Sequence, residues 1–266
     1  MNPHSLNPYM LTSAAVLLVL FAIELHKGFY RTRRMNWNDR LINVVSFAHE
    51  LVIVRPFVVF ATAWVLGELF PAHTELLAGV PFWPALILFL VSEDLVQYWW
   101  HRKGHEWNWL WKIHKVHHSA TEMSVAVTAR GNILWFLLMP TNYYAAAAVY
   151  FGLGEVYLLA YAIKAVINFL SHTGLRWDLH LLEKFPWISP IWWGVERTVT
   201  TADTHHAHHG MAGEMAQPMG NYAPVFFLWD VIFGTAKIPR TAQQKIGIEK
   251  GGGAPWYEQL YWNQRN

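Results

Sequence analysis

The sequence predicts an all-helical integral membrane protein, and three observations support this fold class. Apolar residues make up 54% of the 266-residue chain and charged residues only 14%, whereas a typical soluble domain is about 25% charged. Several apolar runs approach the ~20 residues that a helix needs to cross the hydrocarbon core. Tryptophan and tyrosine, which collect at membrane–water interfaces, number 16 and 11.

Five apolar segments are predicted to be membrane helices. In chain order they cover residues 9–25, 44–70, 82–100, 133–151 and 155–170. The second is interrupted by Glu50 and Arg55, which can pair with each other. A hairpin of the fourth and fifth segments that does not cross completely is an alternative. We therefore expect four to five membrane helices, followed by a histidine-rich helical cap in the cytoplasm.

The basic residues predict the orientation of these helices. Residues 26–40, 101–130 and 172–266 contain five, five and eight Lys or Arg, whereas 71–81 and 152–155 contain none. Cytoplasmic loops carry an excess of Lys and Arg. The three basic segments are thus expected in the cytoplasm, with the N-terminus outside, in an inner (cytoplasmic) membrane or an ER-like membrane.

Histidines gather at helical spacing in three short stretches. Within each stretch they are mostly three or four residues apart, so a helix places them on one face. The members are His101 and His105, then His114, His117 and His118, and finally His205, His208 and His209. Two copies of H-x-x-H-H are expected by chance on the order of 0.001 times. Imidazoles repeated on separate helices predict a site for more than one metal ion.

The composition restricts the chemistry of this site. The chain has no cysteine, which excludes disulfides, thiolate metal sites, iron–sulfur clusters and cysteine nucleophiles. The metal must therefore be held by histidine and carboxylate, which suits iron, zinc or manganese. Eight or nine imidazoles are too many for one structural zinc ion, which closes with four ligands. The net charge of +2 gives no indication of nucleic-acid binding.

Polar residues within the apolar segments are costly to expose to lipid and are therefore informative. Asp94 lies two helical turns before His101, and we expect it to orient a histidine ring; a helix-end acid at the interface is the alternative. Lys164, Asn168 and His172 recur every four residues. This stripe should face the protein interior, either lining a substrate channel or forming an interhelical hydrogen bond.

The chain is interpreted as one domain, 1–266. Residues 8–171 would hold the membrane helices with histidine boxes at 101–118, residues 172–242 the cap with the last box, and residues 243–266 a peripheral tail. A tryptophan-rich stretch at 187–193 indicates either an interfacial amphipathic element or ordinary core packing.

Four sequence pieces together resemble the fatty acid hydroxylase/sterol desaturase superfamily. They are D-L-V-Q-Y-W-W-H-R-K-G-H, H-K-V-H-H-S, T-H-H-A-H-H-G and G-N-Y-A-P-V-F-F-L-W-D-V-I-F-G-T, within residues 92–235. The resemblance implies a mostly helical membrane oxygenase with a histidine-coordinated di-metal centre. Such enzymes use dioxygen and electrons from a separate carrier to hydroxylate or desaturate fatty acyl chains, sterols, sphingoid lipids, carotenoids or alkylglycerols.

The resemblance also assigns roles to residues. It makes the three boxes metal ligands and equates His172 with an isolated histidine that follows the last membrane segment. Some members have a further histidine where this chain has Arg176, so that ligand is missing or replaced by water, a carboxylate or His180. We interpret His206 as lying behind the ligands, with direct coordination as the alternative. Asp230 is expected to hydrogen-bond a ligand imidazole or to cap a turn.

The leading hypothesis is an O2-dependent di-iron lipid hydroxylase or desaturase. It requires two Fe ions, although zinc can occur in a purified sample, and an external electron donor of the cytochrome b5, ferredoxin or reductase type. One alternative is a membrane metal transporter or metal-binding protein. Another is a zinc-dependent lipid hydrolase with Glu106, Glu196 or Asp203 as general base.

Overall fold

The computed structural model describes residues 7–31, 35–211, 213–249 and 253–261. Within these ranges the secondary structure is helical, apart from one isolated bridge between Gly210 and Ile246. The longer helices are α1 (Pro8–His26), α2 (Trp37–His49), α3 (Arg55–Leu69), α4 (Phe82–Glu106), α5 (Asn108–His118), α7 (Pro140–Tyr150), α8 (Gly154–His172), α9 (Trp177–Lys184) and α10 (Ser189–Thr198). The shorter ones are η1 (Glu50–Val54), η2 (Pro71–His73), η3 (Val125–Ala129), α6 (Ile133–Leu138), η4 (Pro186–Ile188), α11 (Ala202–His208), α12 (Leu228–Ile232) and α13 (Trp256–Tyr261).

Three of the described helices are long and apolar enough to cross a membrane. They are α1, the continuous helix Trp37–Leu69 formed by α2, η1 and α3, and α8. These correspond to the first, second and fifth segments predicted from the sequence. Within the second, the guanidinium of Arg55 lies 2.7 Å from the carboxylate of Glu50, so the two charges that interrupt the apolar run neutralise each other.

The prediction of one membrane helix at 133–151 is wrong. The segment is broken at Met139 into α6 and α7, and Pro140 is the first residue of α7. Proline has no N–H to donate and disfavours helical backbone at the residue before it. Each piece is shorter than the ~20 residues that a span needs. The third segment forms α4, one helix of 25 residues whose second half carries buried acids and histidines.

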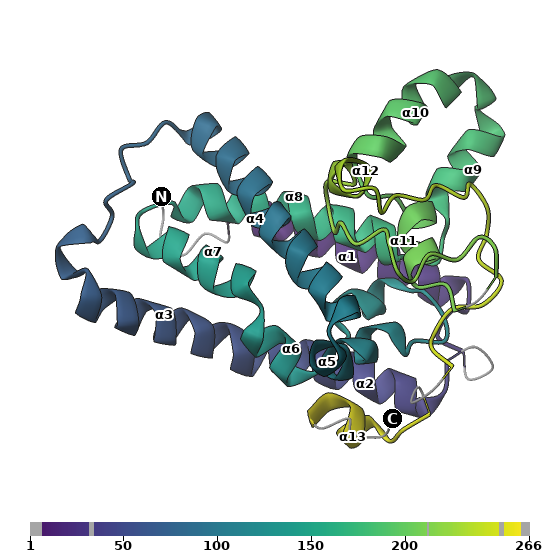
Figure 1. Cartoon of the computed structure of the whole chain (residues 1–266), viewed down its shortest axis with the longest axis horizontal. Helices are drawn as coiled ribbons and strands as arrows, with labels where there is room; N and C mark the ends of the chain where they lie inside the picture. The colour runs from purple at the N-terminus through teal and green to yellow at the C-terminus, as the bar shows by residue number, and fades with distance from the viewer. Residues whose placement is uncertain (1–6, 32–34, 212, 250–252, 262–266) are drawn as a thin grey trace.

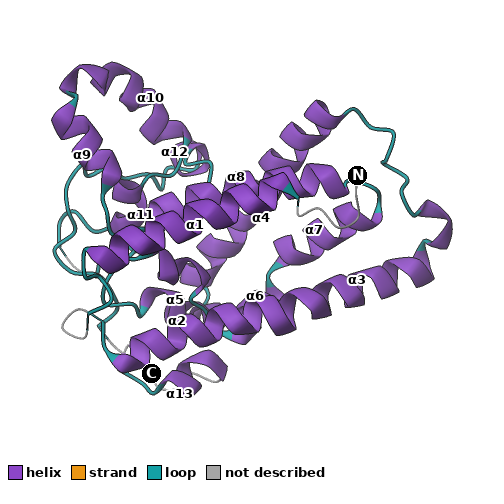
Figure 2. Cartoon of the chain, turned by 180° about the vertical axis from the view of Figure 1, so that it is seen from behind, coloured by secondary structure: helices purple, strands orange, loops and turns teal. Residues whose placement is uncertain are grey.

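Helices α1, α4 and α8 lie side by side, and their C-terminal ends meet near α5 and α11 (Figure 1). Leu86, Phe89 and Leu90 of α4 pack against Val156 and Ala160 of α8. The small Ala160 side chain lets the two helix backbones approach closely. Seen from behind, the same bundle extends to one side while the shorter C-terminal helices and loops surround the other end (Figure 2).

The end of α8 is fixed to α1 by one buried carboxylate. Glu24 of α1 accepts hydrogen bonds from Val125 N–H at 3.0 Å, Thr173 Oγ1 at 2.6 Å and Gly174 N–H at 3.0 Å. A side chain at Gly174 would collide, because a Cβ there would lie 2.1 Å from the ring of Phe29. This packing sets the position of His172, the last residue of α8.

Candidate metal centre

The structure brings the nine predicted ligands together in two adjacent groups. Within each group the candidate nitrogen atoms all lie within 4.8 Å of one another. The first group contains His101, His105, His114, His118 and His208. The second contains His117, His172, His205 and His209. The groups touch, since the rings of His118 and His209 stack with centroids 4.4 Å apart.

Main-chain carbonyls orient four of these rings. Each accepts a hydrogen bond from a ring Nδ1 atom: Tyr222 O from His101 at 2.6 Å, Gly220 O from His208 at 2.7 Å, Arg130 O from His117 at 3.1 Å, and Asn168 O from His172 at 2.8 Å. A carbonyl oxygen can only accept, so Nδ1 carries the hydrogen and the neutral ring keeps a lone pair on Nε2. The tautomer of each ring is thereby fixed by its backbone partner.

In each group two of these lone pairs face each other. The Nε2 atoms of His101 and His208 are 3.0 Å apart, and those of His117 and His172 are 3.3 Å apart. With both Nδ1 atoms protonated, two neutral rings have no hydrogen to place between their Nε2 atoms. Two imidazole nitrogens bound at right angles to one ion at about 2.1 Å are themselves ~3.0 Å apart. The geometry therefore fits a coordination shell rather than a hydrogen-bond network.

Burial keeps the rings in the form that binds metal. It lowers the pKa of His101 to about 4, despite the favourable hydrogen bond to the Tyr222 carbonyl. Burial, and the proximity of neighbouring histidines, also hold the pKa well below the usual range for His105, His114, His117, His118, His205, His208 and His209. Metal ligation requires the neutral imidazole, so these rings need not lose a proton at neutral pH.

Aromatic side chains enclose the first group. The ring of Trp135 lies 4.1 Å from that of His114, and the ring of Trp111 lies 5.1 Å from that of His105. Gly104 leaves room for the Trp135 ring beside His114, because a Cβ at position 104 would lie 2.8 Å from Trp135. The apolar shell restricts access of water to the histidines.

The two acids expected to touch a histidine ring act elsewhere. Asp94 accepts hydrogen bonds from Phe226 N–H at 3.0 Å and Trp229 Nε1 at 3.1 Å, and so ties α4 to the start of α12. Asp230 accepts the N–H groups of Tyr222 at 2.8 Å and Ala223 at 2.7 Å. The Ala223 N–H belongs to the same peptide group as the Tyr222 carbonyl that holds His101, so Asp230 supports this ring through that peptide.

Of the polar stripe of α8, Lys164 is the residue that contacts α4. The ammonium of Lys164 pairs with the carboxylate of Glu93, and the side chain of Asn168 donates to the Lys164 carbonyl at 2.9 Å. The main chain of Asn168, rather than its amide group, reaches His172. These contacts are interhelical and intrahelical polar bonds, and a substrate channel along the stripe stays a prediction.

Other residues weighed as ligands lie outside both groups. His206 is buried and belongs to neither group, and its position behind the ligands stays a prediction. Arg176 donates to the Gln243 carbonyl at 3.2 Å. His180 is exposed and lines a surface hollow with Arg176, so it does not replace the ligand that some relatives have.

The carboxylates that a hydrolase would use as a base are all engaged elsewhere. Glu106 pairs with Arg102 and Lys103. Glu196 pairs with Arg197 and Arg240. The carboxylate of Asp203 accepts the main-chain N–H groups of Arg240 and Thr241.

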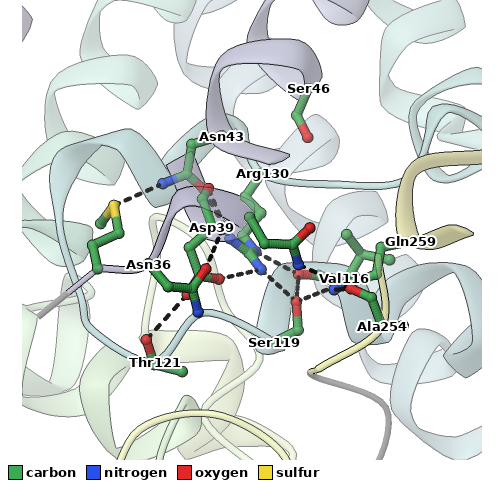
Figure 3. Close-up of polar contacts among 12 residues, drawn as sticks. Asn36, Asp39, Asn43, Ser46, Val116, Ser119, Thr121, Arg130, Ala254 and Gln259 are labelled. Carbon is green, nitrogen blue, oxygen red and sulfur yellow. Dashed lines mark hydrogen bonds and ion pairs between the residues drawn. The ribbon is translucent and has the colours of Figure 1, made fainter. Parts of the chain in front are cut away.

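A buried arginine behind the second box is the main element that sequence reasoning missed. Figure 3 shows the Arg130 guanidinium between Asp39 and Asn43 of α2 and Ser119 after α5. It also donates to the Val116 carbonyl at 2.9 Å, while its own carbonyl holds His117. The sequence offers little signal for this role, since Arg130 simply precedes Gly131 and Asn132 at the start of an apolar run.

A family model described as fatty acid hydroxylase matches residues 86–235, which include all nine histidines. The chain belongs to the fatty acid hydroxylase family. Curated relatives include alkylglycerol monooxygenase of Homo sapiens, 28% identical over 64% of this chain and 37% of the relative. Methylsterol monooxygenase erg25A of Aspergillus fumigatus is 30% identical over 60% of this chain and 49% of the relative.

A third relative is cholesterol 25-hydroxylase-like protein 1, member 2 of Danio rerio, 27% identical over 72% of this chain and 63% of the relative. The chain thus spans less than two thirds of the length of each of these family members. No solved structure matches.

Proposed function

We propose that this chain is an oxidoreductase, a dioxygen-dependent lipid hydroxylase or desaturase whose two histidine groups each hold one iron ion. The facing Nε2 lone pairs of His101 and His208, and of His117 and His172, carry this proposal, because a bound cation would remove their repulsion. The nitrogen donor set suits iron as well as zinc. The names of the family members, which are monooxygenases and a hydroxylase, favour iron.

Bound iron would supply the activation of dioxygen, which no amino-acid side chain provides. The chain's own residues prepare the ligands for it. The carbonyls of Tyr222, Gly220, Arg130 and Asn168 hold ring tautomers and orientations before metal binds. Trp135 packs on the first group and limits the entry of water.

The proposed substrate is a fatty acyl, sterol or related lipid. His172 is the last residue of α8, an apolar helix that is long enough to span a membrane, and the other histidines of both groups lie next to it. Hydroxylation converts C–H to C–OH and consumes one dioxygen, two electrons and two protons, with release of one water. Desaturation consumes the same reactants and releases two waters. Relatives named monooxygenase or hydroxylase favour the first outcome.

Both reactions need an external electron donor, for which we propose a cytochrome b5, a ferredoxin or a reductase. We also propose that the histidine site faces the cytoplasm. Supporting this topology, α1 ends and α2 begins next to the basic segment 26–40, and α8 ends at His172 among the ligands. Basic segments remain preferentially on the cytoplasmic side.

The proposal is tested by comparing the lipids of a host that makes the wild-type chain with those of a host that makes His117→Ala, under ¹⁸O2. A lipid class that gains one ¹⁸O atom only with the wild type establishes hydroxylation. A class that loses two hydrogens establishes desaturation. His206→Ala is the control, because His206 is a buried histidine that lies outside both groups. Turnover that persists in His117→Ala, or without oxygen, contradicts the proposal.

A further inference from the structure

The hairpin of α9, η4 and α10 has no partner on much of its surface. We call residues 177–198 the arm. Figures 1 and 2 show the arm projecting to one side of the bundle, across the direction of α1 and α8, at the end where α11 lies. It contacts the rest of the chain mainly at its base, where α9 packs against α11 and α10 packs against α12.

The tip and outer face of the arm expose large apolar side chains. Trp187 is 75% exposed, Ile191 71% and Trp193 57%. Of the tryptophans in this stretch, only Trp192 is buried, where its ring contacts Trp177 of α9. Core packing thus accounts for Trp192 alone. Contiguous exposed apolar surface of this kind marks an interaction site.

The exposed apolar surface of the arm continues onto α12 and onto the residue that follows it, which lies beside α4. Helix α12, which contacts α10, exposes Leu228, Val231 and Ile232. The ring of Phe233, directly after α12, lies 5.1 Å from that of Trp99 on α4. An apolar band therefore runs from the outer face of α4 across α12 to the arm, continuous with the surface that the membrane helices present to lipid.

Cations accompany the aromatic residues of the arm. The ammonium of Lys184 lies 5.4 Å from the ring centre of Phe185, and the guanidinium of Arg197 lies 4.1 Å from that of Trp193. Tryptophan beside Lys or Arg is typical of segments at the level of lipid headgroups, where the ring is partly in hydrocarbon and the cation reaches phosphate.

We propose that the arm is an interfacial anchor that lies in the headgroup layer of the membrane that α1 and α8 cross, on the side of the histidine site. The exposed apolar face of the arm would contact the lipid bilayer itself. Helices of this type lie in the plane of the interface with their apolar face at the boundary between headgroups and acyl chains. The arm would thus hold the C-terminal histidine box and α12 at a fixed depth, next to the lipid from which a substrate would come.

The absence of cysteine permits a direct test of this placement. Single variants Trp187→Cys and Ile191→Cys are labelled with an environment-sensitive fluorophore in the full-length protein. The labelled protein is reconstituted in phosphatidylcholine–phosphatidylglycerol vesicles. Quenching is measured with lipids that carry a nitroxide at a shallow or a deep position, and with aqueous iodide. Glu183→Cys is the control, since Glu183 is an exposed charged residue of the same arm and lies beside His180 and Arg240 in a surface hollow.

We expect shallow nitroxide lipid to quench the labels at 187 and 191 several-fold more strongly than the label at 183, with the opposite order for iodide. Equal quenching at all three positions would overturn the proposal. A blue-shifted emission that lipid nitroxide does not quench, and that depends on the protein-to-lipid ratio, would instead assign the surface to a second copy of the chain. All three positions are on the surface, so the substitutions remove no buried contact.

Discussion

The Nε2 atoms of His101 and His208 face each other at 3.0 Å, although the two residues are 107 positions apart in the chain. Each ring gives its Nδ1–H to a main-chain carbonyl, of Tyr222 and of Gly220 respectively. The arrangement places lone pair against lone pair, which costs free energy unless a cation lies between them. The backbone that holds these rings therefore gives them an arrangement that could bind a metal ion.

The first prediction concerns metal content. Replacing His208 with alanine removes one nitrogen of the five-histidine group and leaves the second group intact. We expect the bound iron to fall from two ions to about one per chain, with loss of activity. Elemental analysis of the purified, folded protein measures this ratio. His206→Ala should retain both ions, and two ions in His208→Ala would show that His208 is not a ligand.

The second prediction concerns stability without metal. Chelation should lower the temperature of unfolding, because ions that bind only the folded state stabilise it by about 2.7 kcal/mol each at a free concentration of 100 Kd. The measurement is thermal unfolding in detergent, with and without a strong chelator. The shift should be much smaller in His205→Ala/His208→Ala, which has lost a ligand from each group. An equal shift in this variant would attribute the effect to metal bound elsewhere.

The candidate ligands of the three boxes could be predicted from helical spacing, and His172 from the family resemblance, but their division into two groups could not. His117 and His118 are neighbours on α5, yet they belong to different groups. Successive helical side chains point about 100° apart, so one faces α8 and the other faces α4. That division depends on how three helices pack, which local spacing does not encode.

The contacts of the buried polar residues could not be predicted from local sequence either, and the break in the fourth apolar segment was missed. Asp94 and Asp230 were identifiable as acids near the site, but their partners lie on residues 222–229, a segment positioned by tertiary contacts. The apolar run at 133–151 was interpreted as one helix despite Pro140, although proline opposes an unbroken helix. Arg130 gave no periodic signal because its partners come from α2 and from the end of α5.

The third prediction concerns the buried ion pair of Arg130 and Asp39, whose nitrogen and oxygen atoms are 2.9 Å apart. Asp39→Asn should destabilise the fold by about 3–5 kcal/mol, because it leaves the arginine charge buried without a counter-ion. Chemical denaturation in mixed micelles measures the change. Glu106→Gln, which removes a more exposed pair with Arg102, should cost no more than about 1 kcal/mol. Similar costs for the two variants would contradict the role of Arg130.

The fourth prediction concerns support of the His101 ligand by Asp230. Its carboxylate accepts three hydrogen bonds, from the N–H groups of Tyr222 and Ala223 and from the hydroxyl of Thr235. An asparagine side chain has one acceptor oxygen and turns an NH2 group toward these donors. Asp230→Asn should therefore cost about 1–3 kcal/mol for each N–H left unpaired and should loosen the Tyr222 carbonyl that orients His101.

The readout that separates this positioning role from general destabilisation is the metal affinity of the five-histidine group, measured by competition with a chelator below the unfolding temperature. Asp230→Asn should lower that affinity by about 10-fold or more, in the range expected for lost partners of a metal ligand. Thr235→Val removes the hydroxyl that bonds Asp230 and the Tyr98 hydroxyl, and leaves both main-chain bonds to Asp230 in place. It should therefore bind metal as the wild type does. If both variants unfold earlier but bind metal equally well, Asp230 merely stabilises the turn and does not position His101.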